Sequence, residues 1–273
     1  MKIVNKEVLA DVSDTKITSL VIQHPPIARK AKPGQFVVVM VNEKGERIPL
    51  TVVDRDEDKG TITLILQLVG LTTKLLGNLN VGDSLYALVG PMGHATEIKN
   101  YGKVILVGGG VGIAEIYPVA KALKKAGNHI VTILGARTKA LLILEKELKA
   151  VSDEFYVTTD DGSYGKKGFT TDVLGKLLVN QQLVYAVGPI PMMRNVSLAT
   201  KNSGIKTLVS LNALMVDATG MCGSCRITVG GEVKFSCVDG PEFDGHLVDW
   251  DELIKRNRIY EEKEKHICKL YKL

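Results

Sequence analysis

Three cysteines and one aspartate form a pattern in which residue type and spacing together predict chemistry. The run is Asp217-x4-Cys222-x2-Cys225-x11-Cys237. Plant-type [2Fe–2S] sites space their first three cysteines as Cys-x4-Cys-x2-Cys, with a fourth further on. The sequence matches this spacing with aspartate in place of the first cysteine. A carboxylate is a harder ligand than a thiolate, so it would alter the electronic properties of such a cluster. The segment predicts electron transfer.

Zinc is the alternative ion for the same side chains, with Asp217 or His246 completing a tetrahedral site. Structural zinc sites usually contain a second close pair of ligands, whereas Cys237 stands alone. A redox-active Cys-x2-Cys lies at the start of a helix after a strand, but Gly220 and Gly223 predict a loop here. The spacing therefore favours iron–sulfur and leaves zinc open.

Length and composition bound the class of protein. A chain of 273 residues can form two domains and a small third one, and its 45% hydrophobic content supports buried cores. The net charge of +5 comes from scattered basic residues, which argues against nucleic-acid binding. The polar N-terminus predicts no signal peptide, and no apolar run reaches the roughly 18 residues of a membrane span. We expect a cytoplasmic protein in which Cys268 is a free thiol.

The elements that must position these residues fall into several parts. Residues 1–98 alternate in hydrophobicity or form apolar runs, with turn residues between them, which predicts a closed β-barrel. The expected strands are 2–10, 15–22, 35–41 and 61–69, and a turn is expected at His24-Pro25-Pro26.

Strands alternate with helices from residue 99 to residue 210, which predicts a doubly wound parallel sheet. The expected strands are 103–107, 129–135, 155–159, 183–187 and 207–211, and the expected helices are 114–126 and 141–150. Residues 211–250 form the cysteine segment, and residues 251–273 are expected to be a charged helical tail.

Glycines follow the first strand of this α/β part. Gly108, Gly109, Gly110 and Gly112 stand between a strand and a helix, where glycine lets the backbone approach a pyrophosphate. The match to GxGxxG is imperfect because position 113 is Ile. Close packing of strand and helix would also explain the glycines, but their position favours a dinucleotide site.

Two more turns follow parallel strands and are expected at the same edge of the sheet. They contain Asp160 with Asp161, and Gly188 with Pro189 and Met192. In the barrel part, Arg47 could bind a phosphate and Thr51 could hydrogen-bond a ring nitrogen. From its residue type alone, however, Arg47 is better explained as a surface residue.

Together these segments resemble the ferredoxin–NADP reductase superfamily over nearly the whole chain. The motifs that carry the resemblance are Pro33-Gly34-Gln35-Phe36, Arg47-Ile48-Pro49-Leu50-Thr51, Gly70-Leu71-Thr72-Thr73, Gly90-Pro91-Met92-Gly93, 108–112 and 188–192. Many members have a cysteine where this chain has Val187, so a thiol at that position is lost.

The resemblance implies a barrel that binds FAD, an α/β domain that binds NAD(H) or NADP(H), and a small [2Fe–2S] module. It implies that Arg47 contacts the FAD pyrophosphate and that Thr51 lies near flavin N5, with no side chain nominated as acid or base. The other implied FAD residues are Pro49, Leu50, Gln67, Gly70, Thr72 and Thr73. The implied NAD(P) residues are Gly108, Gly109, Gly110, Gly112, Asp160, Asp161, Gly188, Pro189 and Met192, and the implied cluster ligands are Asp217, Cys222, Cys225 and Cys237.

Within the superfamily, the chain looks most like two electron-transfer subunits. The dihydroorotate dehydrogenase subunits carry four cluster cysteines. An aspartate at the first ligand position, as at Asp217, makes this chain more similar to the small subunit of NADH-dependent ferredoxin:NADP oxidoreductase. That resemblance implies a larger partner with its own FAD and [4Fe–4S] clusters, ferredoxin as a reactant of that partner, and a bifurcating reaction. A non-enzymatic alternative is a zinc-stabilised regulatory scaffold that binds a nucleotide. Arg137 could contact a 2′-phosphate or face solvent, so NADH is favoured over NADPH by resemblance only.

Overall fold

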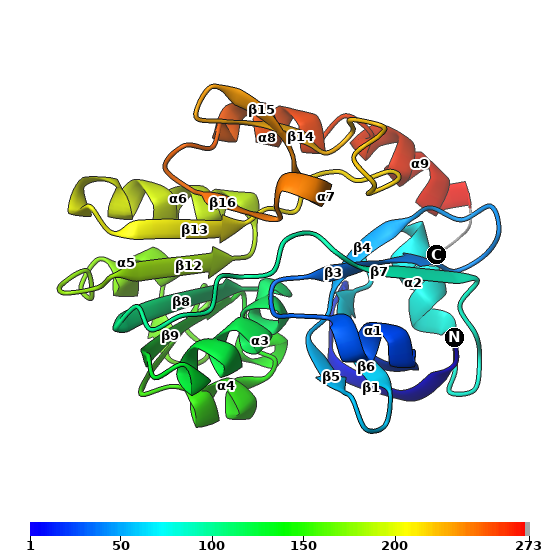
Figure 1. Ribbon diagram of the computed structural model, residues 1–273, viewed down its shortest axis with the longest axis horizontal. Coiled ribbons are helices and arrows are strands. Elements are labelled where there is room, and N and C mark those ends of the chain that lie inside the picture. Colours follow the sequence, from blue (N-terminus) through cyan, green and yellow to red (C-terminus); the bar gives the residue numbers. More distant parts are fainter. Residues whose placement is uncertain (271–273) are drawn as a thin grey trace.

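The N-terminal part contains two antiparallel sheets that wrap around one core. The computed structural model describes residues 1–270 and is shown in Figure 1. One sheet has the order β1-β2-β6-β5 and the other β4-β3-β7. The strands are β1 (Ile3–Val12), β2 (Thr15–Gln23), β3 (Phe36–Met40), β4 (Ile48–Thr51), β5 (Asp54–Asp56), β6 (Thr61–Gln67) and β7 (Ala87–Met92). The predicted barrel is confirmed, with strand ends shifted by a few residues.

The barrel is filled by the apolar residues that alternate along its strands. Leu20, Leu64 and Val37 are fully buried in one cluster. Helices α1 (Pro25–Lys30) and α2 (Leu71–Asn78) add Ile27 and Leu76 to it. The two helices therefore share one core with the two sheets.

The turn expected at residues 24–26 is wrong, because helix α1 begins there. Proline suits the first turn of a helix, where its missing N–H leaves no hydrogen bond unmade. His24 precedes the helix and its Nδ1 accepts from Ile27 N at 3.3 Å. The His-Pro-Pro sequence is therefore a helix start.

The α/β part is a seven-stranded sheet of order β11-β10-β9-β8-β12-β13-β16. All neighbours are parallel except β13 and β16. The strands are β8 (Lys103–Gly109), β9 (His129–Ala136), β10 (Glu154–Thr159), β11 (Lys166–Lys167), β12 (Leu183–Val187), β13 (Lys206–Ser210) and β16 (Glu242–Asp244). The helices are α3 (Gly112–Lys125), α4 (Glu145–Val151), α5 (Thr170–Leu174) and α6 (Ile190–Thr200).

One predicted helix of this part is shorter than expected. The predicted helix 141–150 is split into a 3₁₀ turn, Lys139–Leu141, and α4. Leu144 between them has a φ of +52°, in the left-handed region, so a continuous helix cannot pass through it.

The cysteine segment folds back onto the α/β sheet. It contains the hairpin β14 (Arg226–Val229) and β15 (Glu232–Phe235), the short helix α7 (Ser236–Asp239), and β16, which pairs with β13. The chain ends in α8 (Trp250–Asn257) and α9 (Glu261–Leu270). The predicted helical tail is thus two helices, and its residues 271–273 lie outside the described part.

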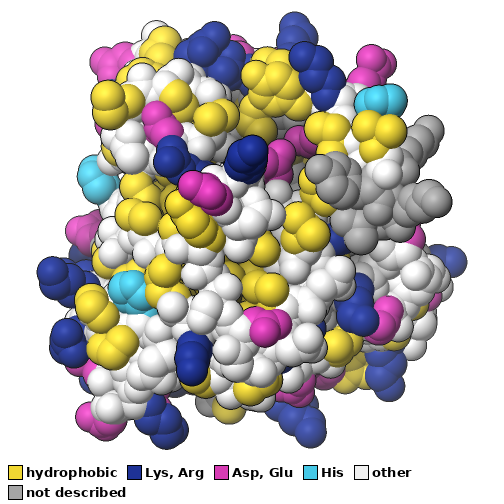
Figure 2. Space-filling model, turned by 90° about the vertical axis from the view of Figure 1, so that its right-hand side faces the viewer, with side chains coloured by type: hydrophobic (Ala, Val, Ile, Leu, Met, Phe, Trp, Pro, Cys, Tyr) yellow, Lys and Arg dark blue, Asp and Glu magenta, His cyan; other side chains and the backbone are white. Residues whose placement is uncertain are grey.

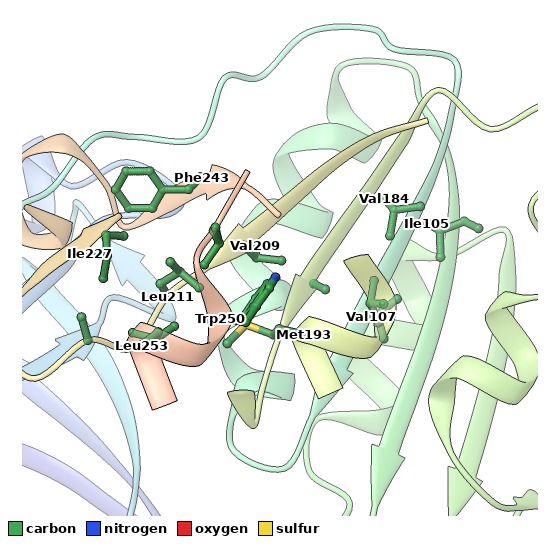
Figure 3. Packing of buried hydrophobic residues seen from close by; sticks show 14 of the residues in the cluster. Ile105, Val107, Val184, Met193, Val209, Leu211, Ile227, Phe243, Trp250 and Leu253 are labelled. Carbon is green, nitrogen blue, oxygen red and sulfur yellow. The ribbon is translucent and has the colours of Figure 1, made fainter. Parts of the chain in front are cut away.

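A continuous apolar core joins the cysteine segment to the sheet. Figure 3 shows Val209 of β13, Met193 of α6 and Ile227 of β14 within it. Trp250 and Leu253 pack there from α8, and Trp250 Nε1 donates to Gly245 O at 3.1 Å. The cysteine segment is therefore held by the same packing as the sheet.

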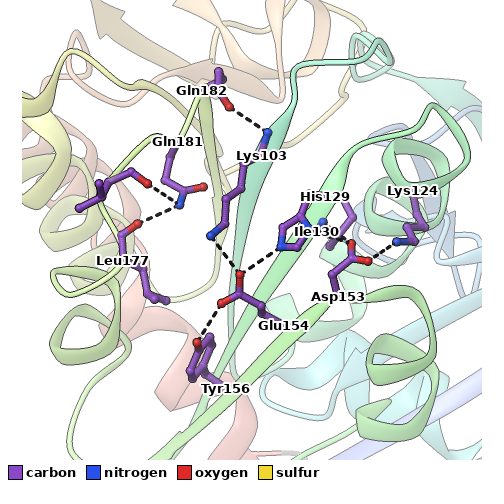
Figure 4. A network of polar contacts seen from close by, with 11 residues as sticks. Lys103, Lys124, His129, Ile130, Asp153, Glu154, Tyr156, Leu177, Gln181 and Gln182 are labelled. Atoms are coloured by element: carbon purple, nitrogen blue, oxygen red, sulfur yellow. Dashed lines mark hydrogen bonds and ion pairs between the residues drawn. The ribbon is translucent and has the colours of Figure 1, made fainter.

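A polar network ties the amino-terminal ends of the parallel strands (Figure 4). Glu154 accepts from Lys103 Nζ and pairs with His129 Nε2, both at 3.0 Å. Asp153 accepts from Lys124 Nζ at 2.6 Å and from Ile130 N at 2.8 Å. The charged groups of this network lie at the edge opposite the glycine turns.

The surface shown in Figure 2 carries basic and acidic side chains interspersed with hydrophobic ones, with no large field of one sign. Among residues 1–270, no helix combines the length and the apolar character that crossing a bilayer requires.

Candidate functional site

Two of the predicted cluster ligands lie side by side in the core. Cys225 Sγ is 3.2 Å from Cys237 Sγ, and each residue is 2% exposed. Burial raises the pKa of the Cys237 thiol to about 12, and its hydrogen bond with Cys225 adds to this. The two cysteines form no disulfide, and each would have to lose its proton to bind a metal.

The other two predicted ligands lie at the surface end of the same loop. Cys222 is exposed, and the Ser224 N–H lowers the pKa of its thiol. The Thr219 N–H donates to Asp217 Oδ1 at 2.8 Å and lowers the pKa of Asp217, and a hydrogen bond with Cys222 lowers it further. Asp217 and Cys222 therefore form a second pair.

Left-handed backbone conformations shape this loop. Ala218, Gly220 and Gly223 have φ values of +61°, +85° and +68°. Glycine adopts this region freely, and the turns at Gly220 and Gly223 fold the chain around Cys222. The absence of a helix here agrees with the loop predicted from the glycines.

The donor set is the one that the spacing predicts, with three thiols and one carboxylate in a single segment. Within residues 1–270, no three His, Cys, Asp or Glu side chains are already gathered around one point. A [2Fe–2S] cluster would take its four protein ligands from Asp217, Cys222, Cys225 and Cys237. His246, the alternative zinc ligand, is engaged elsewhere, because its Nε2 lies 2.9 Å from Thr200 Oγ1.

The predicted FAD residues lie along one edge of the barrel. Pro49, Leu50 and Thr51 form β4, whose only partner is β3. Arg47 precedes β4 and is exposed. Its neighbour Glu46 accepts a hydrogen bond from Thr72 Oγ1, which brings this loop to the amino end of α2.

The start of α2 is open to a ligand. A Cβ built on Gly70 would meet nothing within 4 Å, and the first turn carries no acidic side chain. Thr73 Oγ1 accepts from the N–H groups of Val69 and Gly70 at 2.9 and 3.0 Å. Gln67 ends β6 just before this turn. The hydrogen bond of Glu46 thus brings the loop that carries Arg47 to the start of α2, where free helix N–H groups could bind a phosphate.

Thr51 makes a contact that the sequence did not reveal. Its Oγ1 donates to Glu115 Oε2 at 3.1 Å, which joins β4 to the first turn of α3. Burial raises the pKa of Glu115 to about 7, and the hydrogen bond from Thr51 opposes that rise. Glu115 lies 64 residues from Thr51 in the chain, so no local motif indicates the contact.

We expect Glu115→Gln to stabilise the flavin-free protein at alkaline pH. A carboxyl whose pKa is raised by folding contributes stability below its unfolded pKa, here 4.5, and loses it as pH rises through about 7. Glutamine keeps the hydrogen bond without the charge. The gain should grow from pH 5 to pH 8 to at most about 3 kcal/mol, reduced by partial exposure. Urea unfolding at each pH measures it, and a pH-independent difference would contradict the assignment.

The predicted nucleotide turns meet at the carboxyl-terminal edge of the sheet. Gly110 N donates to Gly135 O at 3.0 Å, and Asp160 N donates to Ala136 O at 3.1 Å. Asp161 accepts from Ser163 N and Oγ at 2.9 and 2.7 Å. The turns after β8 and β10 are therefore both bonded to the end of β9, at the edge where open α/β sheets bind their ligands.

Close approach explains two of the glycines directly. A Cβ on Gly112 would lie 2.5 Å from Val187 O and 2.8 Å from Gly188 Cα. A Cβ on Gly109 would collide with Met192 Sδ and lie 3.2 Å from Pro189 Cδ. The turns after β8 and β12 are thus interlocked, and Met192 fills the space that Gly109 leaves.

Arg137, whose role was left open, bonds to the barrel. Its Nη2 donates to Thr15 Oγ1 and lies 3.7 Å from Asp14 Oδ1. The guanidinium is therefore shared with the β1–β2 turn.

A second half-buried carboxyl joins all three parts of the molecule. Glu242 of β16 accepts from Tyr185 OH of β12 at 2.8 Å and from Thr96 Oγ1. Burial raises the pKa of Glu242. No local motif indicates this contact either, because its members are 57 and 146 residues apart.

Comparison with known proteins agrees with this geometry. Three family models match consecutive segments: an oxidoreductase FAD-binding domain over residues 1–96, an oxidoreductase NAD-binding domain over 106–197, and the iron–sulfur cluster binding domain of dihydroorotate dehydrogenase B over 212–249. A dihydroorotate dehydrogenase B electron transfer subunit homologue from Thermotoga maritima is 53% identical over 246 residues, which is 89% of this chain and 87% of the relative. The chain belongs to the dihydroorotate dehydrogenase B electron transfer subunit family.

Other members of the family are more distant. The electron transfer subunit from Geobacillus thermodenitrificans is 34% identical over 252 residues, or 89% of this chain and 95% of the relative. A solved structure of the NADH-dependent reduced ferredoxin-NADP oxidoreductase, described in connection with flavin-based electron bifurcation, is 49% identical with a TM-score of 0.93. It covers 100% of this chain, which covers 98% of it.

Membership of the dihydroorotate dehydrogenase B electron transfer subunit family confirms the predicted fold class and the predicted FAD, NAD(H) and iron–sulfur cofactors. The chain is an oxidoreductase subunit, and the names of its relatives imply a partner subunit. The zinc-stabilised scaffold is set aside, because the cysteine segment matches an iron–sulfur domain. The roles of individual residues stay predictions.

Proposed function

We propose that this chain is the FAD and [2Fe–2S] subunit of an NADH-dependent ferredoxin:NADP oxidoreductase. It exchanges hydride with NAD(H) and passes single electrons to a larger subunit that carries FAD and [4Fe–4S] clusters. The observation that carries the proposal is an aspartate, Asp217, at the first ligand position of a segment whose thiols Cys225 and Cys237 are buried 3.2 Å apart. Ferredoxin reacts through the larger subunit, in a bifurcating reaction, and the assembly works in the cytoplasm.

Each part of the chain has one task in this proposal. Residues 1–98 hold FAD, residues 99–210 the nicotinamide nucleotide, residues 211–250 the cluster, and residues 251–273 form a tail. Arg47 and the amino end of α2 bind the pyrophosphate, and Pro49, Leu50 and Thr51 line the flavin. The glycine turns and Asp160, Asp161, Pro189 and Met192 hold the nucleotide. Bound FAD supplies the change from two-electron to one-electron chemistry, and the protein supplies position.

The first experiment measures the cofactor content of the purified chain and the rate at which NADH and NADPH reduce its flavin. We expect one FAD and about two iron and two sulfide per chain, with faster flavin bleaching by NADH than by NADPH under anaerobic conditions. Zinc without iron, or no flavin after gentle purification, would contradict the proposal. Co-purification from the native cell should bring a larger flavin and iron–sulfur subunit.

We expect Asp217→Cys to retain the cluster but lower its reduction potential, because a thiolate donates more electron density to iron than a carboxylate does. The EPR g-values should move together with the potential. The matched control is Asp239→Asn, a neighbouring carboxylate that bonds Phe235 N at 2.6 Å and lies outside the ligand set. An unchanged spectrum and potential in Asp217→Cys would show that Asp217 is not a ligand.

The second candidate is an electron transfer subunit of dihydroorotate dehydrogenase itself, which the name carried by the Thermotoga maritima relative favours. Reduction of NAD⁺ coupled to oxidation of dihydroorotate to orotate by the native complex would establish that function. Ferredoxin-linked turnover without any orotate reaction supports the first.

A further inference from the structure

Glu115 is a carboxyl group for which the proposed electron transfer has no use so far. It is only partly accessible and stands in the first turn of α3, and its side chain accepts a hydrogen bond from Thr51 of the barrel at 3.1 Å. A pocket of about 270 Å³ lies between the barrel and α3, and its lining includes residues 52–55 of the barrel and Pro118, Lys121 and Ala122 of α3. Glu115 therefore lies where the two nucleotide-binding parts meet.

The surroundings of Glu115 do not neutralise a negative charge. Tyr185 of β12 feels the charges of both Glu115 and Glu242, which raise its pKa after burial does. Further along α3, Lys121 is paired with Asp54 at 3.0 Å, so that cation is already balanced. Strands β8 and β9 also pack on α3, but their charged residues Lys103 and His129 lie at the amino-terminal ends of the strands, away from the start of α3. The charged residues on α4, which packs on α3 as well, are Glu145, Lys146, Glu147 and Lys149.

We propose that Glu115 is a redox-linked proton-binding site, which takes up a proton when the flavin beside Thr51 is reduced and releases it when the flavin is reoxidised. The inference rests on the proposed function, since it requires FAD with its N5 edge near Thr51. Two added electrons and the hydrogen on N5 leave a reduced flavin with one negative charge at neutral pH. A carboxylate beside that charge, in a partly buried seam, gains affinity for a proton.

The step balances in atoms and electrons. NADH gives a hydride, which supplies the N5 hydrogen and two electrons, while the Glu115 carboxylate takes one proton from solvent. On reoxidation the two electrons leave singly to the [2Fe–2S] cluster, and the N5 hydrogen leaves as a proton. Glu115 then returns its own proton to solvent, so NADH still yields NAD⁺, one proton and two electrons. Thr51 couples the Glu115 carboxyl to the flavin, because the Thr51 hydroxyl can donate a hydrogen bond either to Glu115 or to the flavin.

The starting protonation state suits this role. Burial places the pKa of Glu115 at about 7 before any flavin charge is added. A like charge nearby raises the pKa of a carboxyl further. Between about pH 7 and the raised pKa, the group is therefore mainly ionised beside oxidised flavin and mainly protonated beside reduced flavin.

The test is the number of protons taken up per two electrons, obtained from the pH dependence of the flavin midpoint potential between pH 7 and pH 8.5. We expect about two protons per two electrons in the wild-type protein and about one in Glu115→Gln. Glu242→Gln removes the other half-buried carboxyl without altering Thr51, and this variant should keep the wild-type number of protons per two electrons. In flavin-free protein, an infrared band of a protonated carboxyl should titrate near neutrality, vanish in Glu115→Gln and persist in Glu242→Gln.

Several results would overturn the inference. One proton per two electrons in the wild-type protein does so without any variant, and so does a wild-type value in Glu115→Gln. Loss of the extra proton in Glu242→Gln but not in Glu115→Gln would show that the proton binds to Glu242 and not to Glu115. If the protein binds no FAD, the proposed function is contradicted. If the protein is replete with FAD and the midpoint potential has the same pH dependence in both variants, only this inference is contradicted.

Discussion

Replacing Cys225 with serine is expected to remove the iron–sulfur cluster and leave the flavin. Cys225 is one of two thiols buried 3.2 Å apart. Of the other three cysteines, Cys222 and Cys237 are themselves predicted ligands and Cys268 lies in α9. Serine offers a harder oxygen that is protonated at neutral pH and binds iron poorly. Iron should fall from about two atoms per chain to near zero. Bleaching of FAD by NADH should stay close to the wild-type rate, whereas electron delivery to the partner should be lost.

The matched control is Cys268→Ser. Cys268 is half-buried in α9 and far along the chain from the cluster loop, so this variant should keep its iron and sulfide. Iron and sulfide assays with an absorbance spectrum decide both cases. Full iron content in Cys225→Ser, or iron loss in Cys268→Ser, would mean that the ligand set is wrong.

Gly112→Ala is expected to destabilise the protein more than any other single methyl group in the nucleotide turns. The added Cβ would lie 2.5 Å from Val187 O and 2.6 Å from Val187 C, and these backbone atoms cannot rotate away. The start of α3 must then move from β12, which also displaces Glu115 from Thr51. We expect a loss of about 3 kcal/mol in the free energy of unfolding, despite the higher helix propensity of alanine.

Gly175→Ala is the control for this variant. Gly175 has right-handed helical angles, and a Cβ there would approach no atom more closely than Thr171 O at 3.5 Å. The same chemical change should be neutral or stabilise by up to about 1 kcal/mol. Denaturant unfolding monitored by circular dichroism measures both, with FAD content as a second readout. Equal stabilities of the two variants would show that the close approach at Gly112 is relieved at little cost.

Local patterns predicted the elements whose stability is decided locally. The strand Leu183–Val187 has the predicted bounds, because a fully buried apolar run has only one suitable place in a parallel sheet. The start of α1 was missed, since Pro25 and Pro26 suit a turn and a first helical turn equally. The break at Leu144 was missed because no glycine marks its left-handed backbone.

The candidate site divides in the same way. The four cluster residues lie within one short segment, so their spacing could reveal them. Glu115 and Glu242 could not be found from sequence, because their partners Thr51, Tyr185 and Thr96 come from other parts of the chain. Their proximity depends on how the barrel, the sheet and the cysteine segment pack together, which no local spacing encodes.

The pairing of β16 with β13 has a consequence for how the molecule avoids aggregation. β13 is buried and apolar at Val209, and without β16 it would be the bare edge of a parallel sheet. Exposed strand edges pair with other chains. The segment that binds the cluster is thus also the cover of this edge. Chains in which that segment is unfolded should associate through β13, so failure to assemble the cluster would be seen first as insolubility.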